Sequence, residues 1–365
     1  MRFRCSKEDL LAGLNPAASV VESRQTLPIL GHLHLQTGDG EVSLTGTDLE
    51  VELQAACVAD VEEAGTATVP ARKFLDIVRS LPEETQVAVL QDDGGVTVQA
   101  GRGRYRLSGL NPEDFPRLEL EEYQQEVAIP QGALKALFEG TSFAMARDDV
   151  RYYLNGILLE WSGSNLRAVA TDGHRLALMD REVEATAEET RVILPRKGVQ
   201  ELERLLADTE EPVSVGFTGN HVRFRLPRVT FTSKLIEGRF PDYRRVIPEA
   251  NGQQVLGDRR QIQQALRRIA ILSNRKTHGI RFSCREGLLE LSAENPDQEE
   301  GAEEVPLSYQ GDSLEIGFNV EYLQQAMSAL PTDEVVIHVW DAQSSCLIMP
   351  PDDTSIKYVI MPMRL

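Results

Sequence analysis

The stretch Ala170-Thr171-Asp172-Gly173-His174-Arg175-Leu176 decides the fold, because part of it occurs elsewhere in the chain. Its Thr171-Asp172 pair repeats Thr47-Asp48, and Glu294-Asn295 stands where a third copy would fall, with a period of about 124 residues. Other motifs recur in the same order at this spacing: Gly31, Gly156 and Gly279; Pro70-Ala71-Arg72-Lys73, Pro195-Arg196-Lys197 and Asn319-Val320-Glu321; Phe115-Pro116 and Phe240-Pro241. The recurrence predicts three copies of one domain.

Each copy is expected to be an α+β domain with an antiparallel sheet and two helices on one side. A first helix is predicted near residues 7–21, 131–145 and 258–272. Apolar residues at helical spacing predict the second helix: Phe74, Ile77, Val78 and Leu81; Val199, Leu202, Leu205 and Leu206; Leu323, Ala326, Met327 and Leu330, with Asn319 as N-cap.

Alternating apolar residues predict strands at 49–53 and 222–226. Stretches bearing Pro, Gly and acidic residues at 119–126 and 249–258 predict linkers. The predicted domains are therefore 1–122, 126–249 and 251–365.

The composition is ordinary for a globular protein, with 41% hydrophobic and 26% charged residues among 365. No apolar run approaches the roughly 18 residues that span a membrane, and the first residues lack the apolar stretch of a signal peptide. We therefore expect a cytoplasmic protein without a membrane partner. Cys5, Cys57, Cys284 and Cys346 are scattered, which favours reduced thiols and predicts neither a metal site nor a cofactor.

The charge is unevenly distributed. A net charge of −19 argues by itself against binding nucleic acid. The six expected helical segments nevertheless contain 12 Lys and Arg against 9 Asp and Glu. Basic helices at equivalent positions of a repeat favour a shared basic face over ordinary solvated surfaces, and such a face would meet phosphates without reading bases.

The sequence lacks familiar catalytic motifs: no phosphate-binding loop, dinucleotide fingerprint, nucleophile elbow or zinc-protease motif occurs. The tightest polar cluster is Thr171–Arg175, where Asp172 could orient His174 as a general base of a hydrolase. The alternative is a structural turn in which Asp172 accepts hydrogen bonds from backbone amides and Gly173 provides the bend. We favour the turn, because no nucleophile is identifiable. We therefore predict no catalytic residue.

Taken together, the motifs resemble one family along the whole chain, the bacterial DNA polymerase III beta subunit or beta sliding clamp. The segments that carry the resemblance are Thr26–Leu30, Leu44–Glu50, Val69–Phe74, Asp149–Gly156, Ala170–Leu176, Glu237–Val246, Ile316–Val320 and Met361–Leu365. The resemblance implies a head-to-tail homodimeric ring of six similar domains, with antiparallel sheets outside and two helices per domain inside. Twelve helices side by side would leave a hole roughly 28 Å across, which is enough for duplex DNA.

The resemblance also implies a function: a processivity factor that encircles duplex DNA without sequence preference and tethers its partners. These partners are the replicative polymerase, the clamp loader, and other polymerases and repair proteins with short clamp-binding motifs. A hydrolase using Asp172 and His174, or an acidic protein-interaction scaffold that never meets DNA, remain the alternatives.

Site residues follow from the same resemblance. DNA contacts are expected at Arg24, Arg72, Lys73, Tyr152 and Tyr153. Asp148 stands where a family member has a neutral glutamine that touches DNA, and a carboxylate there would repel phosphate. The peptide-binding cleft is expected to comprise Leu154, Thr171, Gly173, His174, Arg175, Leu176, Pro241, Arg245, Val246, Ser345, Val359, Ile360, Met361, Pro362, Met363, Arg364 and Leu365.

The dimer interface is expected between the first domain of one chain and the last domain of the other. Apolar contacts flanked by Arg–Glu pairs are predicted there. The residues are Arg102, Arg104, Tyr105 and Leu107 in the first domain and Ile271, Leu272, Gln298, Glu299 and Glu300 in the last.

Overall fold

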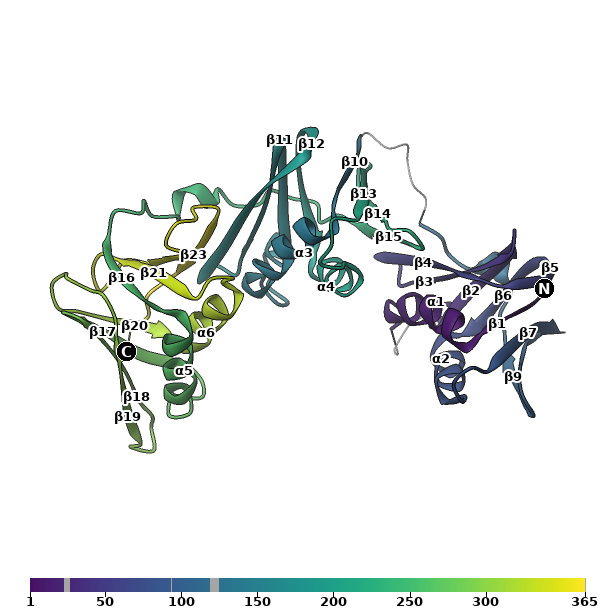
Figure 1. The fold of residues 1–365 in the computed structure, drawn as a ribbon, viewed down its shortest axis with the longest axis horizontal. Helices are drawn as coiled ribbons and strands as arrows, with labels where there is room; N and C mark the ends of the chain where they lie inside the picture. The colour runs from purple at the N-terminus through teal and green to yellow at the C-terminus, as the bar shows by residue number, and fades with distance from the viewer. Residues whose placement is uncertain (23–26, 93, 119–124, 365) are drawn as a thin grey trace. The chain divides into compact units, whose positions relative to one another are not determined.

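The computed structural model describes residues 1–22, 27–92, 94–118 and 125–364. Over these residues the chain forms two compact units, 1–132 with 200–235 and 133–199 with 236–365. The central repeat is therefore divided, with strands in the sheets of both units. The predicted antiparallel sheets and paired helices are confirmed (Figure 1).

The first unit contains two antiparallel sheets. The five-stranded sheet has the order β5-β1-β7-β8-β9 and the eight-stranded sheet the order β10-β13-β14-β15-β4-β3-β2-β6. The strands are β1 Arg2–Ser6, β2 His32–Gly38, β3 Glu41–Thr47, β4 Val51–Val58, β5 Asp60–Glu63, β6 Gly65–Pro70, β7 Gln86–Asp92, β8 Gly95–Ala100, β9 Gly103–Ser108, β10 Gln125–Pro130, β13 Pro212–Phe217, β14 His221–Arg225 and β15 Val229–Lys234.

The second unit also contains two antiparallel sheets. Their orders are β11-β12-β23-β22-β21-β16 and β19-β18-β17-β20. The strands are β11 Gly156–Thr171, β12 Arg175–Pro195, β16 Gln253–Asp258, β17 Gly279–Arg285, β18 Leu288–Glu294, β19 Glu300–Pro306, β20 Leu314–Asn319, β21 Glu334–Val339, β22 Cys346–Met349 and β23 Ile356–Ile360.

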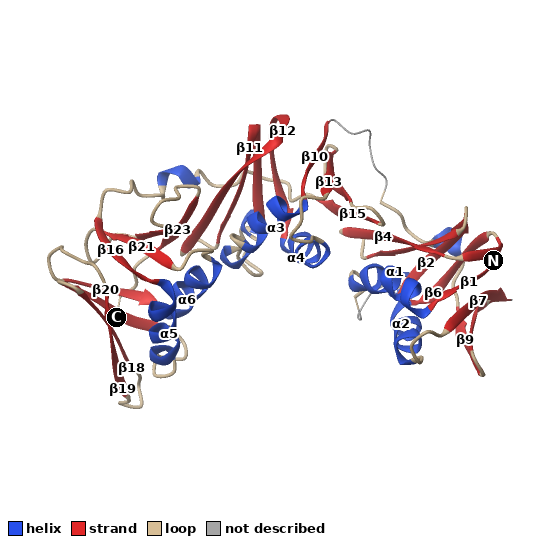
Figure 2. Ribbon diagram, viewed as in Figure 1, coloured by secondary structure: helices blue, strands red, loops and turns tan. Residues whose placement is uncertain are grey.

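Helices pack in pairs on one face of the sheets, as Figure 2 shows for α1 with α2 and for α5 with α6. Side-chain caps start three of them: Ser6 accepts from the Asp9 amide, Asp258 from Gln261, and Asn319 from Glu321 and Tyr322. The predicted Asn319 cap is thus confirmed. The α-helices are α1 Lys7–Ser19, α2 Ala71–Ser80, α3 Gln131–Glu139, α4 Arg196–Leu205, α5 Arg259–Ala270 and α6 Val320–Ala329, and the short 3-10 helices are η1 Pro28–Gly31, η2 Pro112–Asp114, η3 Ser142–Ala144, η4 Tyr152–Leu154 and η5 Tyr243–Arg245.

The predicted apolar faces of the second helices point into the core. Phe74, Val78, Leu202 and Leu323 are fully buried or nearly so. Ile77 and Leu205 are half-buried.

Three sequence predictions were wrong in detail. The helix predicted at 131–145 ends at Glu139, because the Thr141 hydroxyl donates to the Leu137 carbonyl and the Thr141 amide bonds to Phe138 instead. The linker predicted at 249–258 contains strand β16, whose Val255 is fully buried. Leu49 is not in a strand but in a turn with φ 78°, and β4 begins at Val51.

The turns at the repeated Thr-Asp pairs have matching hydrogen bonds. In each, the Thr hydroxyl donates four residues ahead, from Thr47 to the Val51 carbonyl (2.8 Å) and from Thr171 to the Arg175 carbonyl (2.6 Å). The Asp carboxylates accept two backbone amides each. Asn295, at the third position, likewise accepts the amides of Asp297 and Glu299. Local structure thus repeats where the sequence does.

Each of the first two turns lies where strands from two repeats pair. At the first junction β4 pairs with β15, and the Lys234 amide donates to the Glu50 carbonyl (2.8 Å). At the second junction β12 pairs with β23, and the Met361 amide donates to the His174 carbonyl (2.9 Å). The same backbone arrangement therefore occurs twice, once in each unit.

Candidate functional site

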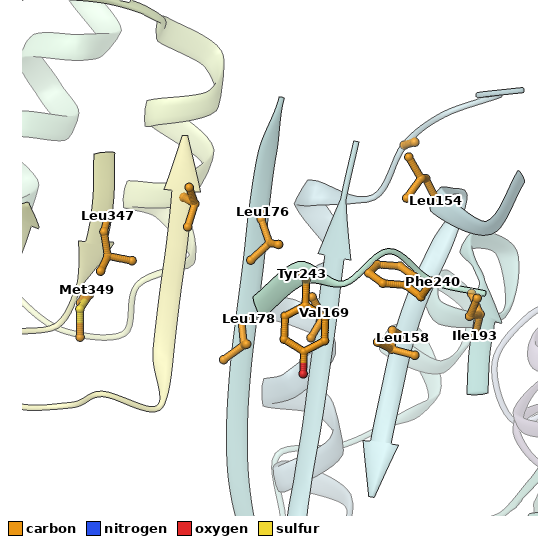
Figure 3. Close-up of a cluster of buried hydrophobic side chains, with 12 residues drawn as sticks. Leu154, Leu158, Val169, Leu176, Leu178, Ile193, Phe240, Tyr243, Leu347 and Met349 are labelled. Carbon is orange, nitrogen blue, oxygen red and sulfur yellow. The ribbon is translucent and has the colours of Figure 1, made fainter. Parts of the chain in front are cut away.

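The second junction holds an open pocket of about 200 Å³ in the second unit. Its floor rests on a cluster of buried apolar side chains that includes Leu154, Leu176, Tyr243 and Val359 (Figure 3). The lining residues are Arg151, Leu154, Thr171, Gly173, Arg175, Leu176, Pro241, Asp242, Tyr243, Val246, Ser345, Val359 and Met361. Ten of the predicted cleft residues are thus brought together around one pocket.

The turn 171–175 shapes one side of the pocket. Asp172 Oδ1 accepts from the amides of His174 (2.9 Å) and Arg175 (3.1 Å), and Gly173 has a φ of 90° that favours glycine. Among the described contacts, the Asp172 carboxylate bonds to backbone amides and to the Arg175 guanidinium, not to the His174 ring. This arrangement is the structural turn, and it supports no catalytic pair.

Arg175 is held from several directions. Its side chain is only 9% exposed and bonds to Asp172 (3.1 Å), to the Phe143 carbonyl (2.5 Å) and to Gln325 of α6. Its guanidinium also lies 4.4 Å from the centroid of the Tyr322 ring. Burial lowers the pKa of Arg175, and the neighbouring Asp172 carboxylate opposes that shift. Arg175 thus links the turn to α6 and also lines the pocket.

Met361 and Val246 provide apolar surface at the rim. Met361 is 46% exposed and Val246 50% exposed, although both line the pocket. A polarizable thioether at an open rim suits ligands of varied shape. The pocket can therefore take apolar side chains of a short segment.

Several predicted cleft residues are not among those that line this pocket. Ile360 is buried in β23, where it pairs with Arg175 and Cys346. Met363 and Arg364 line a separate cavity of about 930 Å³, and the Met363 amide donates to the Gly317 carbonyl. His174, Arg245 and Pro362 are not among the lining residues. Leu365 lies outside the described residues.

Three lining residues were missed by the prediction: Arg151, Asp242 and Tyr243. All three lie inside the segments that carried the resemblance, at 149–156 and 237–246. Their position in these segments could have indicated that they belong to the pocket. Arg151 is held by Asp149 through Nε (3.0 Å) and Nη2 (2.8 Å). Its hydrogen bonds lower the pKa of Asp149 to about 2.

The predicted DNA contacts are spread over both units. Arg72 and Lys73 are exposed on α2. Tyr152 is exposed, while Tyr153 packs against the apolar cluster of the pocket. Asp148 is exposed in a turn with φ 52°, and Arg24 lies outside the described residues.

The helices are more basic than the sequence prediction, because Glu22 lies beyond α1 and Asp258 caps α5 from outside. The six described α-helices carry twelve Lys and Arg against seven Asp and Glu. With a chain charge of −19, the acidic residues are therefore concentrated in strands and loops.

The predicted interface residues lie in or next to edge strands and at a helix end. β9 and β19 are edge strands of their sheets, and Ile271 just after α5 is 78% exposed. Tyr105 is 38% exposed, but Leu107 faces the core of its own domain, because its side chain is 7% exposed. Of these two apolar residues only Tyr105 is available to a partner.

No helix in the described part of the chain is both long and apolar enough to cross a membrane. Nor do the described residues bring three or more His, Cys, Asp or Glu side chains together as metal ligands. All four cysteines are free and buried.

Comparison with known proteins defines the class as a DNA clamp. Family models of the DNA polymerase III beta subunit match the N-terminal domain at residues 1–119, the central domain at 128–242 and the C-terminal domain at 244–364. The chain belongs to the DNA polymerase III beta subunit family. The predicted resemblance is confirmed, while the domain boundaries 1–122, 126–249 and 251–365 stay a prediction.

The curated relatives agree over full length. The chain is 46% identical to the beta sliding clamp of Pseudomonas aeruginosa and 44% identical to that of Escherichia coli K12, covering 100% of both chains in each case. A crystal structure of the DnaN sliding clamp of P. aeruginosa bound to griselimycin matches with a TM-score of 0.97 at 46% identity and complete coverage of both chains. The Caulobacter crescentus beta sliding clamp matches with a TM-score of 0.95 at 34% identity, covering 100% of this chain and 99% of that one.

Proposed function

We propose that this chain is a non-catalytic processivity factor of the replicative DNA polymerase. Two copies close head-to-tail into a ring around duplex DNA, and partner proteins bind through the pocket at the second junction. The observation that carries the proposal is this pocket, lined mainly by apolar side chains, in a chain similar over its full length to beta sliding clamps. The protein works in the cytoplasm, without a cofactor.

The charge distribution supports a topological mode of DNA binding. Basic helices attract phosphate, and an otherwise acidic surface repels it. Retention by enclosure rather than by affinity allows sliding. Arg24, Arg72, Lys73, Tyr152 and Tyr153 are proposed to contact the duplex, and Asp148 to weaken the contact at its position.

The partners carry short apolar motifs. The replicative polymerase, the clamp loader and other polymerases and repair proteins are proposed to share the pocket in turn. Griselimycin, a peptide-like compound bound by the P. aeruginosa relative, is proposed to bind this pocket as well.

Clamp loading tests the proposal. The protein is mixed with clamp loader and nicked circular DNA, and the circle is then linearised. We expect retention on circles and loss from linear ends. Equal retention on both forms would contradict the ring, and no binding to either would favour an acidic scaffold.

The proposed dimer interface has its own test. Ile271 is exposed beside Leu272, and both are proposed to meet Tyr105 of the other chain, flanked by Arg102, Arg104 and Gln298–Glu300. Replacing Ile271 and Leu272 together by Ala should give folded monomers, since the apolar centre of the interface is lost. A double variant that sediments as a dimer at low micromolar concentration would place the interface elsewhere.

A further inference from the structure

A network of polar side chains on β11 and β12 contacts Tyr243, one of the residues that line the pocket. The hydroxyl of Tyr243 donates to the Glu160 carboxylate and accepts a hydrogen bond from Arg167 Nη1 at 3.0 Å. Tyr243 and Val169 belong to the same cluster of buried side chains, which Figure 3 shows. Tyr243 lines the pocket, while its hydroxyl is bonded to two residues, Glu160 and Arg167, that do not.

Arg167 is itself fixed by a two-pronged ion pair. Its Nε and Nη2 bond to the two carboxylate oxygens of Asp180 at 2.6 Å and 2.9 Å. Arg167 and Asp180 are direct cross-strand partners of β11 and β12, and Asn165 also donates to Asp180 (3.3 Å). Bidentate pairs of this kind constrain geometry strongly.

Glu160 is held from the other side. Arg191 Nε lies 3.3 Å from one carboxylate oxygen and Arg244 Nη2 lies 3.7 Å from the other. The Glu160 side chain is 14% exposed, so its charge is partly shielded from solvent. Burial raises the pKa of Tyr243, and its hydrogen bond to Glu160 adds to the shift.

The segment that carries Tyr243 has little structure of its own. η5 is a single 3-10 turn of three residues, without a side-chain cap at Asp242. Its neighbours Pro241 and Val246 line the pocket. A turn this short needs tertiary contacts to hold one conformation.

We propose that Glu160, Arg167 and Asp180 are positioning residues of the pocket: through Tyr243 they hold the Pro241–Val246 wall in the conformation that receives a ligand. The inference rests on the proposed function of this pocket. None of the three residues lines the pocket, so they act on it only through other residues, and Tyr243 is the lining residue to which Glu160 and Arg167 bond.

Calorimetric titration with griselimycin tests the inference on the full-length protein. Tyr243→Phe removes both hydrogen bonds of the hydroxyl and Arg167→Met removes one of them, so each is expected to weaken binding about five- to tenfold. The double variant should bind about as weakly as either single variant, since both changes remove the same constraint. Glu160→Gln, which keeps an oxygen acceptor, should bind nearly as the wild type, while Glu160→Ala should not.

Arg285→Met is the matched control. It breaks an ion pair of similar length, Arg285 to Glu290 at 2.7 Å, on β17 and β18 of the same unit. We expect its affinity to stay within about twofold of the wild type. Thermal melts of every variant test whether the protein is folded. If Arg167→Met does not fold, the nearly isosteric Tyr243→Phe still tests the inference.

Unchanged affinity in folded Tyr243→Phe and Arg167→Met would overturn the inference while leaving the proposed function intact. Strictly additive losses would overturn it too, because they would mean separate effects. If the wild-type chain binds no griselimycin, the assignment of the pocket fails first, and the inference fails with it.

Discussion

The first and second junctions have the same backbone but present different side chains. Both turns use a Thr hydroxyl and an Asp carboxylate in the same way, and both accept a backbone amide from the neighbouring strand. At the first junction that amide belongs to Lys234, whose side chain lies 3.4 Å from Glu50. At the second it belongs to Met361, which lines an apolar pocket.

The difference in side chains between the two junctions shows which parts of the repeat are structural and which form the pocket. Leu49 and Glu50 of the first turn correspond to Gly173 and His174 of the second, and the chain after Lys234 continues as Leu235 and Ile236. After Met361 the chain continues as Pro362 and Met363. The same backbone turn therefore occurs twice, and the pocket arises from the side chains beside the second copy. Binding should therefore depend on the second junction alone.

Removing the tail should have the largest effect. Deletion of Met361–Leu365 takes away a wall of the pocket and should weaken griselimycin binding at least about 100-fold. It also removes the amides of Met361 and Met363, which donate to His174 and Gly317, at a cost of about 0.5–1.5 kcal/mol each. Calorimetry and thermal melts measure both effects. A sharp drop in melting temperature with affinity preserved would show that the tail is structural only.

Exchanging the residues between the junctions should have the next largest effect. Met361→Lys makes the second junction resemble the first and should weaken binding about tenfold, because an ammonium group must lose water at an apolar rim. Lys234→Met is the matched change at the first junction and should leave the affinity unchanged. Equal effects of the two changes would contradict the distinction between the junctions.

Removing the turn carboxylates should separate stability from binding. Asp48→Ala and Asp172→Ala each free two backbone amides and should cost about 1–2 kcal/mol of stability. Only Asp172→Ala should also weaken griselimycin binding, by about three- to fivefold, since its turn lines the pocket. Denaturant unfolding and calorimetry on both variants make the comparison, and loss of affinity in Asp48→Ala would break it.

The smallest effect is expected from pH. Arg151 lowers the pKa of Asp149 to about 2, from an ordinary value of 3.8. A lowered carboxylate pKa means that the ion pair is fully present above about pH 4 and is lost only as the pH falls through about 2. The ratio of wild-type to Asp149→Asn affinity should therefore stay constant between pH 5 and 8. A ratio that changes more than twofold in this window would show that another group controls Arg151.

The sequence predicted the repeat, the helix faces and most of the pocket for identifiable reasons. The Thr-Asp pairs predict local hydrogen bonds, as at Thr171 and Asp172. The spacing of apolar residues predicts burial, as at Phe74. Element ends were less predictable, because the end of α3 depends on one hydroxyl of Thr141. Strand β16 was missed since its Val255 is buried by tertiary packing rather than marked by a long apolar run.

The division of roles within the tail was also beyond the sequence. Ile360, Met361 and Met363 are close in the chain, yet they face the sheet interior, the pocket and a separate cavity. Tyr243 was missed because its anchor, Glu160 and Arg167, lies some 80 residues away in the chain. Such contacts follow from strand register, which no local pattern reveals.

Methyl NMR of methionine-labelled protein tests the central claim most directly. The Lys234→Met variant carries a methionine methyl group at positions 234 and 361, the residues whose amides bond to the two turns, while Met145 and Met327 are buried controls. Saturating griselimycin should shift the signal of Met361 and leave that of position 234 unchanged. A shift at position 234 as large as that at Met361, or no shift at Met361, would contradict a binding pocket confined to the second junction.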